Sequence, residues 1–424
     1  MLNIKPFCAL RPHTDLCLKI ASVPYDVVDR EEAFTLARDN PLSFLHVSRA
    51  EIDLPADVNP YSPEVYAKAK ENFMAMQTRE YLIRERQSMF YIYRQQRQGR
   101  FQHGLVACCS VKDYEDDIIK KHEKTRVDKE EDRTRHTAAL RAHSGPVFLT
   151  YQDDATVDAI ICQTEKQEPL YDFVASDGVG HTVWPISETE PLIAAFRAVQ
   201  TAYIADGHHR AAAGVRVAKE LALADLTGSN HKIEINEKLN TILWFDPEKE
   251  YNWFLAVLFP AGQLQILPYN RCVNDLGGMS ANRFLEEVKK RFTVEENAGP
   301  SPDRPGLISM FFEKSWLGLT PRQMPPANDP VAGLDVSILQ GQLFEPVLGI
   351  RDPRTDKRLD FIGGIHGAGE LERRVNAGKA VVAFSMYPVT VRQLMAISDA
   401  GQIMPPKSTW FEPKLRDALL IHTF

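Results

Sequence analysis

The sequence predicts a mixed α/β protein of the α+β type, with a main lobe and a smaller additional lobe. β-forming runs alternate with helical patterns, polar turns join some strands as in antiparallel hairpins, and 424 residues exceed the usual length of one domain. We expect a main lobe over 1–274, a smaller α/β lobe over 275–375, and a C-terminal segment, 376–424, that returns to the main lobe.

The first long elements are expected to be helical. Asp29 is a good N-cap for "REEAFTLARDN", whose early glutamates suit the positive end of a helix dipole. The run "NPLSFLHV" (40–47) favours an extended segment. A long helix is predicted over 62–86, because Ser62 can cap it and Pro63 suits its first position.

The middle of the chain is expected to be rich in strands. The segment 88–111 predicts a hairpin, since a polar, glycine-containing connection joins two β-rich runs. A strand at 146–153, a second hairpin through 158–184 and a helix at 187–198 are expected to follow. These elements lead into an apolar strand at 200–205.

The last half continues the alternation. We expect a helix at 208–225, paired strands within 238–247 and 251–260, a strand at 264–271, a helix at 280–292 and strands near 307–313. Segments rich in proline and glycine predict surface loops at 298–306 and 319–330.

Composition excludes several classes of protein. The net charge of −7 disfavours a general nucleic-acid binder, which needs a basic surface. The six cysteines are scattered without a C-x-x-C pair, so neither a zinc knuckle nor a disulfide framework is indicated. No apolar run reaches the roughly 18 residues that a membrane span needs. We expect a cytoplasmic protein without a membrane partner, and a homodimer is one alternative for its assembly.

The most informative stretch is "YIADGHHRAAAG", where an apolar strand becomes a helix through a polar turn. A purely structural interpretation assigns Asp206 as the helix N-cap, Gly207 as the tight turn and the alanines as a packing face. That interpretation leaves His208, His209 and Arg210 unexplained. Polar side chains beside free backbone N–H groups at a helix N-terminus favour phosphate or carboxylate binding. Because adjacent helical residues point about 100° apart, we expect no metal ligand here.

The turn also carries a resemblance. "YIADGHHR" is similar to the signature of the bacterial and archaeal family called domain of unknown function 1015, and other pieces match it in order: "PYDV", "KHEKT", "EDR", "RAHSGPVFL", "ILPYNR" and "MPPKSTWFEPKL". That family resembles the ParB/sulfiredoxin-like superfamily, which includes free-serine kinases with a D-G-H-[HT]-R turn that holds nucleotide phosphates. The resemblance implies a ParB/sulfiredoxin-like core that binds ATP or ADP with Mg²⁺, with the phosphates on Gly207, His208 and Arg210.

A charged block at 118–143 supplies further candidates. Lys129, Arg133 and His136 recur at i, i+4 and i+7, so one basic stripe is predicted along a helix, with Arg133 on the outer phosphates. Solvated charges on a helix surface are the structural alternative. Ahead of this helix, "HEKT" follows a strand end, where catalytic side chains are often displayed.

Phosphoryl transfer to an alcohol needs a base and cations, and these residues can supply both. Glu123 is the candidate base, Asp206 is the alternative base, and His209 is the third catalytic candidate. His122, Lys124 and Lys407 are assigned to phosphates, while Asp26, Thr125 and Thr409 are assigned to the substrate.

For several of these candidates a structural role is the alternative, and Glu123 is alternatively a structural carboxylate. A turn-forming aspartate is the alternative for Asp26. The loop that carries Lys407 and Thr409 is alternatively a plug, packed on the core through Trp410 and Phe411.

The function predicted from these residues is a nucleotide-dependent kinase acting on a small hydroxylated metabolite, such as free serine or a hydroxy acid. A regulatory protein that binds CTP or ATP in the manner of partitioning proteins is the first alternative, although no helix-turn-helix module is evident. A phosphohydrolase built on the same site is the second. The glycine cluster at 361–375 fails the G-x-G-x-x-G spacing and does not indicate a dinucleotide site.

Overall fold

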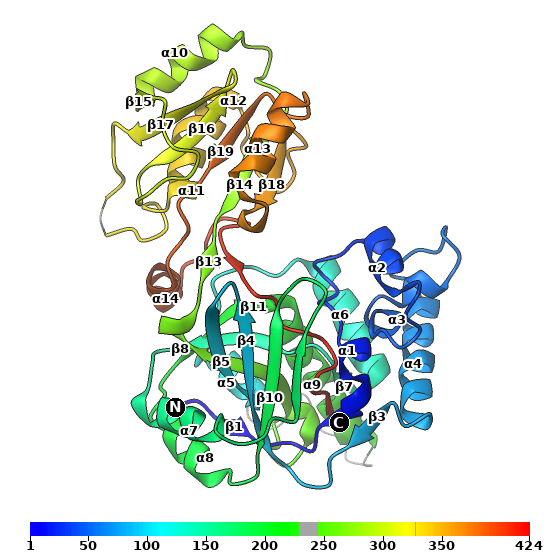
Figure 1. Cartoon of the computed structure of the whole chain (residues 1–424). Helices are drawn as coiled ribbons and strands as arrows, with labels where there is room; N and C mark the ends of the chain where they lie inside the picture. Colours follow the sequence, from blue (N-terminus) through cyan, green and yellow to red (C-terminus); the bar gives the residue numbers. More distant parts are fainter. Residues whose placement is uncertain (229–244, 327) are drawn as a thin grey trace. The chain divides into compact units, whose positions relative to one another are not determined.

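The computed structural model describes residues 1–228, 245–326 and 328–424, which form two compact units (Figure 1). The first unit is Met1–Leu264 with Pro413–Phe424, and the second unit is Gln265–Glu412. From the sequence, the boundaries of the second unit were predicted at 274/275 and 375/376; in the structure they lie at 264/265 and 412/413. The second unit begins earlier and ends later because its short strands β13 (Ile266–Leu267) and β20 (Trp410–Phe411) pair with each other.

A mixed sheet forms the centre of the first unit, as the predicted fold class requires. Its strand order is β6-β11-β8-β12-β5-β4-β10-β9, with β1 paired to β5. β11 is parallel to β6 and β12 is parallel to β8, while the other neighbours are antiparallel. The strands are β1 (Ile4–Lys5), β4 (Phe90–Arg97), β5 (Arg100–Ser110), β6 (Ile119–Lys120), β8 (Val147–Tyr151), β9 (Tyr171–Val174), β10 (Gly180–Ile186), β11 (Ala202–Asp206) and β12 (Trp253–Pro260).

The predicted hairpin at 88–111 is present as β4 and β5. Its two turn residues, Gln98 and Gly99, have φ values of +48° and +78°, as the tight turns that suit twisted hairpins require. The second hairpin is shorter than predicted. It comprises β9 and β10 only, because 155–164 forms helix α7 (Ala155–Thr164) capped by the Asp154 side chain.

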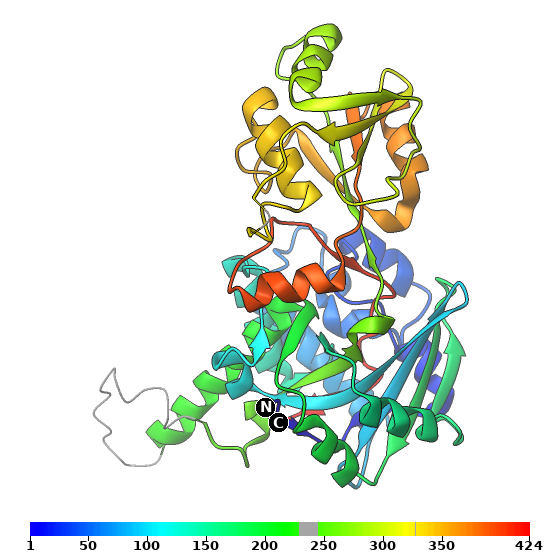
Figure 2. The ribbon, with the colours of Figure 1, turned by 90° about the vertical axis from the view of Figure 1, so that its left-hand side faces the viewer.

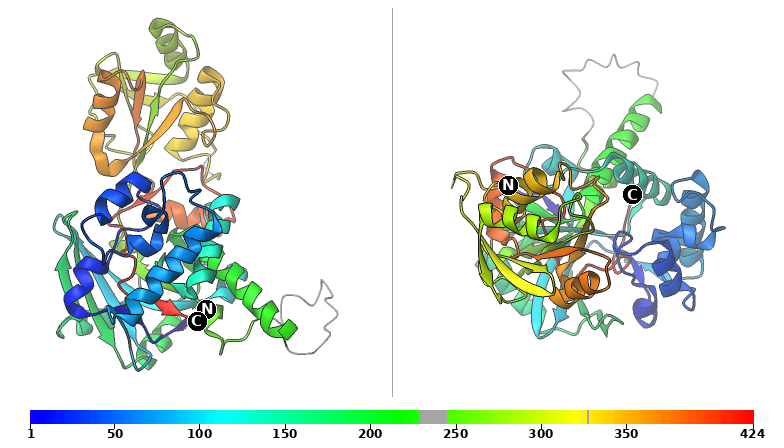
Figure 3. Two further views of the ribbon diagram at one scale, coloured as in Figure 1. Left: turned by 90° about the vertical axis from the view of Figure 1, so that its right-hand side faces the viewer. Right: turned by 90° about the horizontal axis from the view of Figure 1, so that it is seen from above.

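Helices of the first unit flank this sheet. In Figure 3 the helices α4 (Pro63–Thr78), α6 (Val127–Leu140) and α9 (His208–Gly228) lie side by side, and α6 contacts both of the others. The apolar faces of these elements fill two buried clusters, one under the sheet and one beneath α4. The other elements are α1 (Cys17–Ile20), α2 (Arg30–Ala37), α3 (Leu45–Ser48), α5 (Val111–Glu115), α8 (Glu190–Phe196), β2 (Leu10–Pro12), β3 (Leu82–Arg84), β7 (Ala142–His143) and β21 (His422–Thr423).

Local signals at helix starts were confirmed at α2 but not at α4, where the Ser62 side chain makes no capping hydrogen bond. The Asp29 side chain accepts from the Glu32 N–H in a complete capping box, as expected. The extended segment expected at 40–47 is wrong, because turns lead into α3 there and bury Phe44 in the cluster beneath α4. α4 ends at Thr78 rather than at 86, since the chain turns into β3. Most of the predicted strand at 238–247 lies outside the described residues.

The second unit has an antiparallel sheet with the order β15-β17-β16-β19-β14-β18. Helix α13 covers one face of the sheet, and the segment from α11 to α12 covers the other (Figure 2). Alternate residues of β19 explain this: Ala383 packs with Leu371 of α13, whereas the Phe384 ring meets Phe344 at 5.3 Å. The elements are α10 (Ala281–Arg291), α11 (Asp335–Leu339), α12 (Glu345–Leu348), α13 (Gly367–Asn376), α14 (Val391–Asp399), β14 (Tyr269–Val273), β15 (Phe292–Glu296), β16 (Ile308–Phe312), β17 (Ser315–Pro321), β18 (Leu359–Gly363) and β19 (Val382–Ser385).

Candidate functional site

The polar turn joins β11 directly to α9. Asp206 ends the strand just after a shift in its register with β8. Gly207 has a φ of +90°, which side chains rarely allow, and a Cβ there would lie 3.1 Å from Arg210 Nε. Its carbonyl accepts the first helical hydrogen bond, from the Ala211 N–H at 3.0 Å. Glycine is therefore required where the strand becomes the helix.

Arg210 is a buried cation between two carboxylates. Its Nη1 donates to the Pro146 carbonyl at 2.6 Å, and its Nη2 lies 3.4 Å from Asp206 Oδ2 and 4.0 Å from Asp26 Oδ2. Burial alone lowers the pKa of Arg210, but these carboxylates outweigh it and raise that pKa above its ordinary value. The guanidinium is thus held in its charged form beside the start of α9.

A second cation reaches the same carboxylate from the C-terminal segment. Lys414 Nζ lies 3.5 Å from Asp206 Oδ2, and the Lys414 carbonyl accepts from Gln95 Nε2 at 2.9 Å, which ties the segment to β4. Lys414 was not among the residues predicted for the site. The sequence signal that could have indicated it is the presence of charged residues in the otherwise apolar stretch "PKLRDALLIHTF".

Asp417 is the other residue that the sequence analysis missed. Its backbone N–H and carbonyl both bond to Ser22, which fixes the side chain against Gly145. Asp417 Oδ1 is buried without a hydrogen-bond partner. Burial raises the pKa of Asp417 to about 7, although the neighbouring Arg210 acts in the opposite direction. A buried carboxyl that titrates near neutral pH is characteristic of functional sites.

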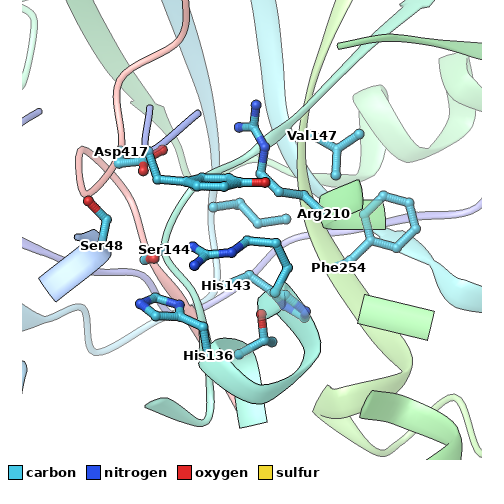
Figure 4. A pocket seen from close by; sticks show the side chains of 13 residues that line it. Ser48, His136, His143, Ser144, Val147, Arg210, Phe254 and Asp417 are labelled. Atoms are coloured by element: carbon cyan, nitrogen blue, oxygen red, sulfur yellow. The ribbon is translucent and has the colours of Figure 1, made fainter. Parts of the chain in front are cut away.

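A polar cavity lies among these groups. Figure 4 shows Arg210, Asp417 and His136 around it, from α9, the C-terminal segment and α6 respectively. A neighbouring cavity shares several of its lining residues and extends along α6 toward Tyr61. The shared residues are Tyr25, Ser48, Arg133 and His136.

The predicted stripe on α6 faces the second cavity but is less basic than expected. Lys129, Arg133 and His136 all line that cavity, as their spacing predicts. Arg133 is already paired, since its Nη2 lies 2.7 Å from Asp132 Oδ2. Burial lowers the pKa of His136 to about 4, so this imidazole is uncharged at neutral pH and donates to the Val47 carbonyl at 3.0 Å. The prediction of a three-residue cationic stripe is therefore corrected.

The "KHEKT" segment meets the turn through histidines from both sides. His209 Nε2 accepts a hydrogen bond from the Arg126 N–H at 3.0 Å. The rings of His122 and His208 are buried, 4.5 Å apart and almost perpendicular, at 88°. The structure thus brings the 121–126 segment and the "DGHHR" turn together, as the sequence analysis expected.

Comparison with known proteins identifies the family. Residues 4–337 match the model of the family described as "Protein of unknown function (DUF1015)". The chain belongs to this family. No curated protein matches the sequence.

Three solved structures are similar to this DUF1015 protein at low identity. They are a free serine kinase in complex with AMP (13% identity, TM-score 0.34, covering 72% of this chain and 89% of that chain), a conserved hypothetical protein from Pyrococcus furiosus (12%, 0.33, 72% and 93%) and SbnI with C-terminal truncation from Staphylococcus aureus (12%, 0.34, 74% and 87%). Within the described part of this DUF1015 chain, no helix has both the length and the apolar character to cross a membrane.

The remaining candidates of this DUF1015 protein lie in different places. Thr125 Oγ1 donates to Glu130 Oε2 at 2.7 Å, so its hydroxyl already has an acceptor, while Lys124 is exposed. Lys407 and Thr409 belong to the second unit. There the Lys407 ammonium lies 5.3 Å from the Tyr269 ring, and their assignment to the phosphate site stays a prediction.

Proposed function

We propose that this protein is a nucleotide-dependent phosphotransferase that acts on a small hydroxylated metabolite, such as free serine or a hydroxy acid. The observation that carries this proposal is the convergence of Arg210 and Lys414 on one oxygen of Asp206 at the start of α9. Two cations, the N–H groups of a helix N-terminus and a carboxylate are groups that phosphoryl transfer uses. The similarity of "DGHHR" to the phosphate-holding turn of free-serine kinases supports the same function.

The phosphates are assigned to the beginning of α9. Gly207 allows the turn to present its backbone N–H groups, and the positive end of the helix dipole favours an anion there. Lys414 and Arg210 supply the charges that offset those of the phosphates. His209 contributes as a neutral donor, because its Nε2 accepts from Arg126 and its Nδ1 therefore carries the proton.

The nucleotide is proposed to be ATP or ADP, with Mg²⁺. Mg²⁺ prefers oxygen ligands such as carboxylates, and Asp26 and Asp206 each offer an oxygen near the same nitrogen, Arg210 Nη2. These two residues would hold the ion, whose chemical contribution is to neutralise charge on the phosphates. The prediction that Asp26 contacts the metabolite is retained in this proposal.

Two carboxylates compete for the role of base. Glu123 is displayed after β6 in the "KHEKT" segment, and Asp206 ends β11. Either could accept the proton of the acceptor hydroxyl, whose oxygen then attacks the terminal phosphorus while the nucleotide leaves. Glu123→Gln abolishes turnover with nucleotide affinity unchanged if Glu123 is the base, whereas Asp206→Asn alters both because Asp206 also contacts the two cations.

The decisive experiment is a search for the phosphorylated product. The full-length protein is incubated with ATP or ADP, Mg²⁺ and a panel of hydroxy acids, and products are identified by mass spectrometry. A phosphorylated hydroxy acid that disappears with Lys414→Met supports the kinase. Inorganic phosphate released without an acceptor favours the phosphohydrolase alternative, and nucleotide binding without any turnover favours a regulatory protein.

A further inference from the structure

Two neighbouring parallel strands bring together residues that are far apart in the sequence. β6 pairs with β11 in parallel, with Ile119 opposite Ala202 and Lys120 opposite Tyr203. The carboxyl ends of parallel neighbours lie at the same edge of a sheet, so His122 after β6 and His208 after β11 meet there. One donor atom from each of His122, Glu123 and His208 lies within 4.8 Å of the other two.

The two imidazoles are prepared as ligands. His122 donates to the carbonyl of Ile204, and its Nδ1 is buried without any hydrogen-bond partner. The donating nitrogen must be Nε2, which leaves the lone pair on Nδ1. A carbonyl that fixes the tautomer in this way is the usual second partner of a metal-binding histidine.

His208 provides the second nitrogen. Its Nε2 is also buried without a hydrogen-bond partner, although the side chain belongs to the first residue of α9. A buried polar atom without a hydrogen-bond partner costs about 1–3 kcal/mol of stability. Here two such atoms belong to imidazole rings whose centres are 4.5 Å apart, so their presence requires an explanation.

We infer that His122, Glu123 and His208 hold a divalent first-row transition metal ion, with Zn²⁺ as the representative. Two imidazole nitrogens and one carboxylate oxygen are a ligand set that such ions accept, and they leave a coordination position open. Mg²⁺ does not suit this set, because it prefers oxygen ligands. The proposed site does not use the adjacent His209; the partner of His208 comes from the other strand.

Alternative uses of this cluster are weaker. The Lys121 ammonium, whose charge acts on His208, lies 4.1 Å from the centre of the Tyr114 ring and 3.6 Å from Asp117 Oδ1, so it has partners outside the histidine pair. Asp206 favours positive charge at His122, as it would favour a bound dication. The site shares Glu123 with the proposed phosphotransferase, but metal binding here is tested without nucleotide and does not depend on that function. If Glu123 binds this ion, the role of base falls to Asp206, and Asp26 alone is left as the carboxylate proposed for Mg²⁺.

The test measures metal binding without nucleotide. The full-length protein is freed of metal with a chelator, titrated with Zn²⁺ against a chromophoric competitor, and analysed for bound zinc by mass spectrometry. Co²⁺ is added in parallel, because its visible absorption reports coordination by nitrogen and oxygen. We expect one tightly bound equivalent, and at least tenfold weaker binding in His122→Gln, His208→Gln and Glu123→Gln.

The matched control is His103→Gln. His103 also lies beside a glutamate, with Nε2 2.8 Å from Glu165 Oε1, but among the described residues it belongs to no group of three ligands. This variant should keep the full affinity for Zn²⁺. The inference is overturned if the unmodified protein binds no stoichiometric Zn²⁺ or Co²⁺, or if Glu123→Gln, which keeps the side-chain shape, and a folded histidine variant both bind like the unmodified protein. None of these outcomes depends on nucleotide binding or turnover, so they are separate from the failure of the proposed function.

Discussion

Lys414 Nζ lies 3.5 Å from Asp206 Oδ2, although 208 positions separate these residues in the sequence. The same oxygen lies 3.4 Å from Arg210 Nη2. Two cations from different segments therefore meet one carboxylate at the point where β11 becomes α9. In the proposed site, the charges of a phosphate would be offset by these two cations.

Replacing Lys414 by methionine should weaken the binding of ADP or inorganic phosphate. A hydrogen bond to a charged group is worth about 1.5–3 kcal/mol, which corresponds to roughly tenfold to a hundredfold or more in affinity. Isothermal titration calorimetry measures this directly. Lys112→Met is the control, because Lys112 forms an exposed pair with Asp116 on α5 and should not change the affinity. Equal affinities for the two variants would contradict the site.

His209→Ala should affect turnover much more than stability. The side chain accepts one hydrogen bond, from the Arg126 N–H, and losing it costs about 1 kcal/mol, or a few degrees in melting temperature. Removing a donor that contacts the reacting phosphate should lower kcat by at least tenfold. Both quantities are measured on the same preparation. A melting temperature that collapses together with activity would favour a purely structural role for His209.

Gly207→Ala should disrupt both the start of the helix and the position of Arg210. The φ of +90° strains any side chain, and the new Cβ would lie 3.1 Å from Arg210 Nε. We expect about 1–3 kcal/mol less stability and weaker phosphate binding. Gly178→Ala is the matched control, since φ is +78° there but no heavy atom lies within 4 Å of the Cβ. This control should lose stability alone; if it loses affinity as well, the effect at Gly207 is not local.

Asp417 should make stability depend on pH. In the unfolded chain an aspartate has a pKa near 4, whereas burial raises the pKa of Asp417 to about 7 in the folded protein. Between these values the folded state binds more protons than the unfolded state. The free energy of unfolding should therefore fall as pH rises from about 4 to about 7, by up to about 4 kcal/mol from this group.

The Asp417→Asn variant isolates this contribution. Buried neutral histidines such as His181, whose pKa burial lowers to about 3, act in the opposite sense, but they are present in both proteins. Urea unfolding between pH 4.5 and 8 should give a difference between the two proteins that grows in favour of the variant as pH rises. A constant difference across this range would show that Asp417 does not carry the titration.

Elements with a strong local signal could be predicted from the sequence. The capping box at Asp29, the hairpin at 88–111 and the change from strand to helix at Gly207 depend on residues within a few positions of each other. The extended segment expected at 40–47 was wrong for the opposite reason. Its apolar residues fit the pattern of a strand. In the fold, however, Phe44 and Val47 pack in a core with residues of α4, and a local pattern carries no information about that distant helix.

Only those parts of the site whose residues are adjacent in the sequence could be predicted. "DGHHR" and "KHEKT" stand out as polar runs after apolar strands, and the structure brings them together. Lys414 and Asp417 do not stand out in the sequence. Their place in the site is evident only from their interactions with Asp206 and Arg210, about 200 positions away. The charge of His136 was misjudged because only the fold determines that it is buried.

The second unit interrupts the first between Leu264 and Pro413. During synthesis the ribosome therefore completes the inserted unit before it releases the last twelve residues of the first one. Those residues carry Lys414 and Asp417, and they supply β21, which pairs with β7. A nascent chain that has emerged only as far as Glu412 would thus present "DGHHR" without Lys414, and the proposed phosphate site would stay incomplete until Pro413–Phe424 follow.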